Sequence, residues 1–117
     1  MLIAEVSKNY DISTDTLRYY ERIGLIPPVT RRSNGIRDYS EEDLGWVSLI
    51  KCMRVAGVEV EALIDYVALY QLGPHTAEER KQILVEQRER LKDRMALMQE
   101  SLDRLDYKIE NYEKLLS

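Results

Sequence analysis

The stretch Thr16–Pro28, TLRYYERIGLIPP, combines a charged, tyrosine-rich helical pattern with an abrupt stop. Two arginines and two tyrosines lie within five residues, next to apolar residues of the kind that form a core. Ser13 can cap a helix that includes them, with Asp15 favourable in its first turn. Gly24 and the two prolines end that helix near Ile23. A short helix that presents arginine and tyrosine together indicates a binding surface.

The segments on both sides of this helix predict a helix-turn-helix followed by a small wing. Residues 2–9 have Ile3 and Val6 on one helical face, and a three-residue turn separates them from the next helix. Residues 29–39 contain an Asn-Gly pair, which is a strong hairpin signal because both residues tolerate positive φ. We therefore expect a two-stranded wing in this segment.

Two further helices complete the predicted first domain, residues 1–73. Ser40 and the acids after it predict the start of a third helix, which should end near Gly57. A fourth helix should span about 60–71 and stop at Gly73-Pro74. Its expected inward positions are Leu63, Ile64, Val67 and Tyr70.

The second predicted domain, residues 76–117, is one long helix with a coiled-coil seam. Thr76 and Glu79 fit a capping box, and no glycine or proline follows them. About 40 residues give a helix of roughly 60 Å, which four short helices cannot cover. We therefore expect a homodimer through the same helix of a second chain, with a helix folded back on its own domain as the alternative. The heptad positions of the seam are Leu84, Leu91, Met95, Met98, Leu102, Leu105, Ile109, Tyr112 and Leu116.

Composition excludes several classes of protein. No apolar run approaches the roughly 18 residues of a membrane span, and the N-terminus lacks a secretory pattern. The single cysteine cannot form a disulfide within the chain, so a cytoplasmic location without a membrane partner is the default. No catalytic constellation, metal-ligand set or phosphate-binding glycine loop is present, and the single histidine lies in an expected loop. We therefore expect neither an enzyme nor a bound metal or cofactor.

The net charge of −4 conceals a local basic cluster. Residues 58–117 hold 9 basic and 13 acidic residues, whereas residues 1–57 hold 8 of each. Residues 18–37 contain five arginines and a single acid, Glu21. Because phosphate attraction acts over a Debye length of about 8 Å, local charge matters more than the total. The cluster favours double-stranded DNA as a partner over an ordinary solvated strip.

One face of the tyrosine-rich helix suits the DNA major groove. Thr14, Arg18 and Arg22 lie four residues apart and share this face, which Tyr19 adjoins. Arginine donors can bind phosphates or guanine edges, and a tyrosine hydroxyl can reach a phosphate. Thr14 and Asp15, early in the helix, are best placed near base edges. Of the two adjacent tyrosines, the second is the better candidate for core packing.

These motifs together resemble the DNA-binding domain of MerR-family transcriptional regulators. The matching segments are Ile3–Ser7 (IAEVS), Ser13, Thr16–Glu21 (TLRYYE), Gly24–Ile26 (GLI) and Gly35–Tyr39 (GIRDY). The resemblance continues into the long helix and so covers nearly the whole chain. It implies a mainly α fold, a winged helix-turn-helix dimer joined by an antiparallel coiled coil. It also implies a regulator that bends and untwists promoter DNA so that RNA polymerase can engage both promoter elements.

The resemblance also implies site residues by position. Arg18 and Tyr19 match helix residues that contact DNA, and Arg37 and Tyr39 match wing residues at the DNA backbone. Ile36 stands where the family usually has a wing tyrosine. The loop after the third helix matches a second wing, although its two glutamates oppose a phosphate contact.

The signal that such a regulator would sense is indicated by its cysteine content. The chain lacks the cysteines of the family's metal sensors and is closest in type to the AdhR/NmlR-like branch. There a lone cysteine on the third helix responds to reactive aldehydes or nitrosative stress, and Cys52 matches it. Lys51 and Arg54 would favour the reactive thiolate, whereas a small buried hydrophobe is the alternative role. For the whole protein, the alternatives are an effector-independent architectural DNA-binding protein and a coiled-coil adaptor.

Overall fold

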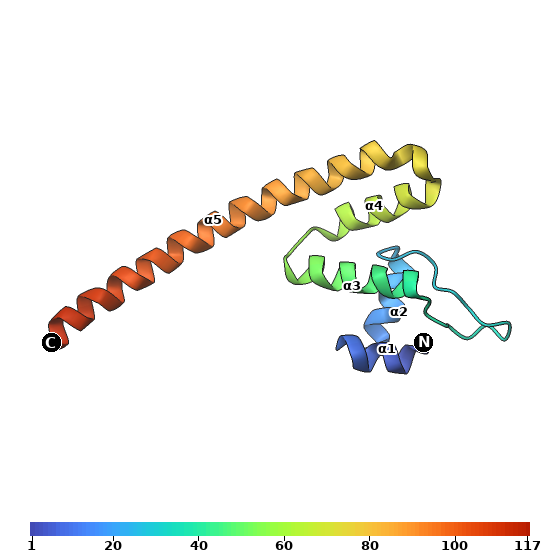
Figure 1. Ribbon diagram of the computed structural model, residues 1–117, viewed down its shortest axis with the longest axis horizontal. Helices are drawn as coiled ribbons and strands as arrows, with labels where there is room; N and C mark the ends of the chain where they lie inside the picture. Colours follow the sequence, from blue (N-terminus) through green and yellow to red (C-terminus); the bar gives the residue numbers. More distant parts are fainter.

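A computed structural model describes residues 1–117 as a small helical head from which one long helix projects (Figure 1). The molecule measures 71 × 35 × 20 Å along its principal axes. Helices α1 to α4 form the head, and α5 runs back along α4 before it extends far beyond the head. No helix is long and apolar enough to cross a membrane.

The helix-turn-helix forms as its local sequence predicts. Helix α1 (Ile3–Tyr10) ends at Asp11, which adopts a left-handed conformation with φ 53°. Helix α2 (Thr14–Ile23) begins after Ser13, whose hydroxyl accepts a hydrogen bond from the Thr16 N–H. It ends at Gly24, whose φ of 84° is strained for any residue with a side chain. The predicted cap and stop of this helix are confirmed.

The wing is a hairpin-shaped loop and has less strand structure than expected. A single antiparallel bridge joins Arg31 to Arg37, and no strand forms around it. The Asn34 side chain accepts from the Ile36 N–H across the turn, where Gly35 has φ 86°. The turn prediction is therefore confirmed, whereas the two-stranded ladder is wrong because the paired segments are too short to continue it.

Helices α3 and α4 form the remaining wall of the head. Helix α3 (Glu41–Val55) begins with a complete capping box between Ser40 and Asp43. Helix α4 (Val60–Leu72) buries Leu63 and Val67 as predicted. Tyr70 was expected to point inward and does not. Its hydroxyl donates a 2.7 Å hydrogen bond to the Glu42 carboxylate at the surface, and its ring packs edge-on against Trp46.

The core of the head draws on every one of its segments, including the turn after α2 and the base of the wing. Leu17, Val47 and Ile50 are completely enclosed, and they come from α2 and α3. The core residues are Val6, Ile12, Leu17, Tyr20, Leu25, Ile26, Val29, Tyr39, Val47, Ile50, Val58 and Leu63. Helix α2 therefore has its inner side anchored in a continuous apolar cluster, which fixes the direction of its outer side.

A short 3₁₀ turn, Pro74–Thr76, links the head to α5 (Ala77–Leu116). The predicted capping box at Thr76 is wrong. The hydroxyl of Thr76 is buried and donates toward the carbonyl oxygens of Leu69 and Gly73. It accepts from the Arg80 side chain of α5 at 3.0 Å and not from a backbone N–H of that helix. The head thus determines the role of this threonine. Helix α5 contains 40 residues and buries none of them within this chain.

Candidate nucleic-acid interface

The outer face of α2 carries the predicted binding residues. Arg18 and Tyr19 are exposed, and so is Asp15, whose side chain is 96% accessible. Arg18 donates from Nη1 to the Asp15 carboxylate at 3.3 Å, and the Arg22 guanidinium lies 5.4 Å from the centre of the Tyr19 ring. These contacts connect exposed groups and leave donors free, so the face can rearrange to meet a polyanion. Thr14 lies half-buried at the start of the same helix.

The two adjacent tyrosines of α2 separate as predicted. Tyr20 is 8% exposed and belongs to the core, whereas Tyr19 is 42% exposed. Burial raises the pKa of Tyr20, and this effect outweighs the nearby positive charge of Arg54. Tyr20 therefore remains a neutral packing residue at neutral pH, and only Tyr19 is available for a ligand.

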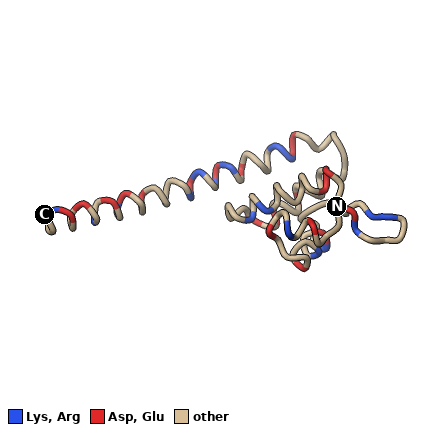
Figure 2. The backbone as a smooth tube through the Cα atoms, turned by 60° about the horizontal axis from the view of Figure 1, so that its bottom comes forward, with Lys and Arg blue, Asp and Glu red and all other residues tan.

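The wing projects three arginines beside α2. Figure 2 shows blue, basic segments along this loop, while the far half of α5 is mostly acidic or uncharged. Arg31 and Arg32 are exposed, and Arg32 makes a 3.4 Å ion pair with Asp38. Arg37 is more enclosed, with 24% of its side chain accessible, because its Nε donates to Glu21 at 2.7 Å.

A hollow of about 370 Å³ lies where α1, α2 and the wing meet. Arg18, Arg31 and Arg37 all line it, together with the first residues of α1. No side chain caps the start of α1, so its backbone N–H groups add to the positive potential there. Three guanidinium groups and a helix N-terminus make this hollow suitable for a phosphate.

Tyr39 does not fit the wing contact that was expected of it. Its side chain is 2% exposed, and its buried hydroxyl has no hydrogen-bond partner in this structure. Burial raises the pKa of this phenol, so it stays neutral. The residue belongs to the core at the base of the wing because Val29, Val47 and their neighbours enclose that position. Within this chain Tyr39 supports the wing and does not present a surface to DNA.

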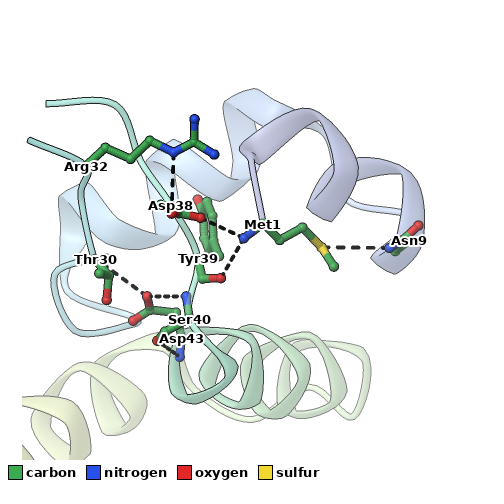
Figure 3. Close-up of polar contacts among 8 residues, drawn as sticks. All are labelled: Met1, Asn9, Thr30, Arg32, Asp38, Tyr39, Ser40 and Asp43. Atoms are coloured by element: carbon green, nitrogen blue, oxygen red, sulfur yellow. Dashed lines mark hydrogen bonds and ion pairs between the residues drawn. The ribbon is translucent and has the colours of Figure 1, made fainter. Parts of the chain in front are cut away.

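Polar contacts hold the base of the wing against the head (Figure 3). The Met1 ammonium group donates to the Asp38 carboxylate at 2.8 Å and to the Tyr39 carbonyl at 3.0 Å. Its hydrogen bond lowers the pKa of Asp38. One oxygen of Asp43 accepts from the backbone N–H groups of Ser40 at 2.9 Å and of Thr30 at 3.0 Å. The wing is thus tied at its base on both sides.

Cys52 is exposed on α3, so the alternative of a small buried hydrophobe is wrong in this chain. Lys51 and Arg54 were expected from the sequence to favour its thiolate, but both bind other groups. Lys51 donates to the Tyr10 carbonyl, and Arg54 donates to the Val58 carbonyl at 3.3 Å. Both cations are therefore engaged by backbone oxygens, and accessibility is the feature that remains in favour of a reactive thiol.

The predicted seam of α5 forms an exposed apolar stripe. Met95, Met98 and Leu105 are 61%, 73% and 61% exposed, and most of the other seam residues are similarly open. The two seam residues nearest the head behave differently: Leu84 and Leu91 line an apolar hollow of about 240 Å³ with Met53, Leu63 and Tyr66. The long helix therefore does not fold back along its whole length, and its distal apolar stripe has no partner within the chain.

Two arginines of α5 that the sequence did not single out contact the loop between α3 and α4. Arg94 donates to the carbonyl oxygens of Ala56 and Gly57, and Arg90 pairs with Glu59. These pairs are 31 to 38 residues apart along the chain, and nothing in the sequence pattern joins them. The role of Glu59 in this pair also removes it as a free negative charge in the predicted second wing.

Glu21 is the other residue that sequence reasoning did not assign, although a signal was present. It is the only acid within the arginine-rich segment 18–37. Its carboxylate accepts from Arg37 and from the Val29 N–H at 2.9 Å, and Arg31 lies 3.7 Å away. An isolated acid among five arginines could have been recognised as their shared partner.

Comparison with known proteins agrees with this geometry. The family model described as "MerR HTH family regulatory protein" matches residues 1–69. The chain is 56% identical over 91 residues to the HTH-type transcriptional regulator AdhR of Bacillus subtilis (strain 168). That match covers 78% of this chain and 65% of AdhR, so it spans just under two thirds of that relative.

Two solved structures extend the similarity to almost the whole chain. A MerR family transcriptional regulator from Listeria monocytogenes is 52% identical, with a TM-score of 0.94 over 97% of this chain and 86% of that one. HiNmlR, a MerR family regulator lacking the sensor domain and bound to promoter DNA, is 32% identical, with a TM-score of 0.86. That match covers 97% of this chain and 90% of HiNmlR.

Proposed function

Because the chain belongs to the MerR family of helix-turn-helix regulatory proteins, we propose that it works as a homodimer that distorts promoter DNA. Membership of the family makes it a DNA-binding transcription regulator and not an enzyme. The observation that carries the dimer is the unpartnered apolar stripe of α5. A helix of 40 residues with heptad spacing and no buried residue needs a second helix to cover it.

In this proposal α5 of one protomer packs antiparallel against α5 of its partner. The two heads then lie at opposite ends of the coiled coil, each with its α2 directed to one half of the operator. The distance between the two α2 helices is set by the coiled coil, because α5 is anchored to its own head by Arg90 and Arg94. A rigid spacing of this kind selects DNA by its shape as well as by its bases.

At each half-site α2 enters the major groove and the wing follows the DNA backbone. Thr14 and Asp15 lie near base edges at the start of α2, while Arg18, Tyr19 and Arg22 bind phosphates or base edges. Arg37 contributes from the wing together with Arg31, and Tyr39 supports them from the core. The long contact surface offsets a bending cost of about 1–6 kcal/mol.

The consequence for transcription is a change of DNA geometry. A promoter whose two recognition elements are misaligned becomes competent when the duplex between them is bent and untwisted. RNA polymerase acting at the same promoter, in the cytoplasm, then engages both elements. HiNmlR supports this proposal because it is similar over nearly the whole chain and is bound to promoter DNA.

Selection of bound sequences from a random DNA pool tests the proposal. We expect an inverted repeat, since two heads related by a two-fold axis read the same half-site. The recovered site, placed at different positions along a fragment, should show position-dependent mobility in a gel, because a bent fragment migrates according to where the bend lies. Affinity should fall steeply with salt, with a logarithmic slope of about 0.9 per phosphate contact.

The alternatives predict different results in the same experiments. A coiled-coil adaptor would yield no enriched sequence and a flat salt dependence. An architectural protein would bend the selected DNA but would leave promoter output independent of any chemical signal. A bound but straight site would contradict the distortion mechanism, while leaving the family assignment intact.

The exposure of Cys52 favours a switch driven by an electrophile as the regulatory step. An aldehyde would add to the Cys52 sulfur to form a hemithioacetal, with the thiol proton passing to the former carbonyl oxygen. A nitrosating agent would transfer NO⁺ to the sulfur as the thiol proton leaves, and either product enlarges the side chain. Cys52 lies one turn before the end of α3, and its carbonyl accepts from the Ala56 N–H at 3.1 Å. Repacking at this end of α3 would move the loop that Arg94 holds and would tilt the head against α5. Such a tilt would change transcription more than affinity.

A further inference from the structure

The acidic residue inside the DNA-facing surface has an unusual environment for its charge. Glu21 lies in the last turn of α2, and only 12% of its side chain is accessible. One carboxylate oxygen, Oε1, accepts from Arg37 Nε at 2.7 Å and lies 3.7 Å from Arg31 Nη2. The other oxygen, Oε2, accepts from the Val29 N–H at 2.9 Å. One enclosed carboxylate thus ties three points of segment 29–37 to α2.

The two arginines that Glu21 holds retain donors for a ligand. A guanidinium group has five N–H donors, and the one hydrogen bond of Arg37 uses only its Nε. Arg31 is further restrained because its Nη1 donates to the Gly35 carbonyl at 2.9 Å. Both side chains line the hollow of about 370 Å³ that Arg18 also lines. Three arginines thus line this space, and one carboxylate pairs with two of them, so the net charge of the group remains positive.

We propose that Glu21 is the positioning residue that fixes Arg31 and Arg37 as a clamp for one backbone phosphate of DNA. The inference rests on the proposed function, which makes DNA the ligand of this surface. Free arginine side chains lose rotamer entropy when they bind, and a carboxylate that holds them in place removes part of that cost before DNA arrives. Glu21 also fixes the wing relative to α2, so the clamp and the recognition helix keep a constant position relative to each other.

This role reverses the sign that simple electrostatics predicts. A carboxylate near DNA repels phosphate, so its neutralisation should tighten binding if Glu21 is only a neighbouring charge. If Glu21 positions the clamp, its neutralisation should weaken binding although no cation has been removed. The salt dependence adds a second readout, because each lost phosphate contact reduces the logarithmic slope by about 0.9.

The experiment compares Glu21→Gln with the wild-type dimer on the selected operator over about 50–200 mM salt. We expect the affinity at physiological salt to fall by about fivefold, as for one lost phosphate contact, and the slope to decrease by about 0.9. Glu5→Gln is the matched control, since it removes the same charge from an exposed position on α1. It should leave both quantities unchanged or slightly favour binding.

A double-mutant cycle with Arg37→Gln then tests the link itself. In the Glu21→Gln background, Arg37→Gln should have much less effect than in the wild type, because the clamp is already released. Additive losses would show that Arg37 binds phosphate independently of Glu21 and would overturn the proposal. Tighter or unchanged binding by Glu21→Gln would overturn it as well.

Two further measurements distinguish a failure of the clamp from unfolding of the variant and from a failure of the proposed function. Glu21→Asp keeps the charge and shortens the side chain, so it should also weaken binding if position matters. This variant replaces Glu21→Gln if circular dichroism finds the latter unfolded, and undiminished binding by a folded Glu21→Asp would overturn the proposal. A wild-type protein that shows no salt-dependent operator binding would refute the proposed function, and the clamp with it. A wild type that binds steeply beside an unaffected Glu21→Gln would refute the clamp alone.

Discussion

Arg94 of α5 donates a 3.0 Å hydrogen bond from Nη1 to the carbonyl oxygen of Gly57, in the turn after α3. Its Nη2 makes a second bond of 3.0 Å, to the Ala56 carbonyl. A guanidinium group at the C-terminal end of a helix also complements the helix dipole. One side chain therefore joins the long helix to the end of the helix that carries Cys52.

Arg94→Ala should loosen this connection. We expect a loss of about 1–3 kcal/mol in the free energy of unfolding, because two carbonyl oxygens lose a charged donor. Urea denaturation followed by circular dichroism measures the change. Arg104→Ala is a suitable control, since Arg104 is an exposed arginine farther along α5. Equal stabilities of the two variants would show that the contact contributes nothing measurable.

The apolar stripe of α5 should be the dimer interface. Met98→Lys combined with Leu105→Lys should abolish dimerisation, because burying two ammonium groups costs several kcal/mol. The residues are 73% and 61% exposed in the single chain, so the head should fold normally. Sedimentation equilibrium gives the mass of the particle. Leu97→Lys with Tyr107→Lys, which changes exposed apolar residues outside the seam, should remain dimeric. A dimeric seam variant would contradict the assignment.

Arg18→Ala should weaken operator binding by about 1–3 kcal/mol without unfolding the protein. The only bond that Arg18 makes within the chain is its 3.3 Å contact with the exposed Asp15, which contributes little to stability. Fluorescence anisotropy with labelled operator measures the affinity, and the thermal midpoint monitors the fold. Arg104→Ala, on the exposed surface of α5 outside the seam, serves as the control. Unchanged affinity would remove Arg18 from the interface.

Promoter output should respond to electrophiles through Cys52. We expect an aldehyde or a nitric-oxide donor to change transcription with the wild type and not with Cys52→Ala. Because Cys52 is the only cysteine, the mass gained by the treated wild type beyond that gained by Cys52→Ala reports modification of the thiol. In the Arg94→Ala variant the thiol of Cys52 should still be modified normally, but the change in promoter output should be smaller than in the wild type. An alanine variant that switches like the wild type would exclude Cys52 as the sensor.

Asp43 should make the stability of the head depend on acid. Burial alone would raise its pKa, but hydrogen bonds from Ser40 and Thr30 together lower the pKa below its ordinary value. The stabilisation is therefore complete above the unfolded value of about 3.9 and is lost as the pH falls through the lower folded pKa. Asp43→Asn should cost about 1–3 kcal/mol at neutral pH and much less near pH 2.

Urea denaturation at both pH values measures this difference. Asp65→Asn, on the exposed side of α4, provides the comparison and should show no such pH dependence. A penalty for Asp43→Asn that stayed constant down to pH 2 would mean that the ionised carboxylate is not what holds the wing and α3 together.

The sequence alone determined the features that depend on neighbouring residues. The hydroxyl of Ser13 and the positive φ of Gly24 define the ends of α2 through contacts within a few residues of the chain. The period of the α5 stripe likewise follows from helix geometry, which repeats along the chain regardless of the surroundings. That one of Tyr19 and Tyr20 is buried and the other exposed was predictable for the same reason, since adjacent residues face different sides of a helix.

Only the tertiary structure decided the roles that depend on segments distant in sequence. Tyr39 became part of the core because α3 closes over the base of the wing, and Thr76 turned toward the carbonyl oxygens of Leu69 and Gly73. Glu21 pairs with Arg37, which is 16 residues away along the chain. Arg94 binds the carbonyl oxygen of Gly57, which is 37 residues away. A side chain with several possible partners takes those that folding brings within about 3 Å, and their identity is set by the packing of the whole head.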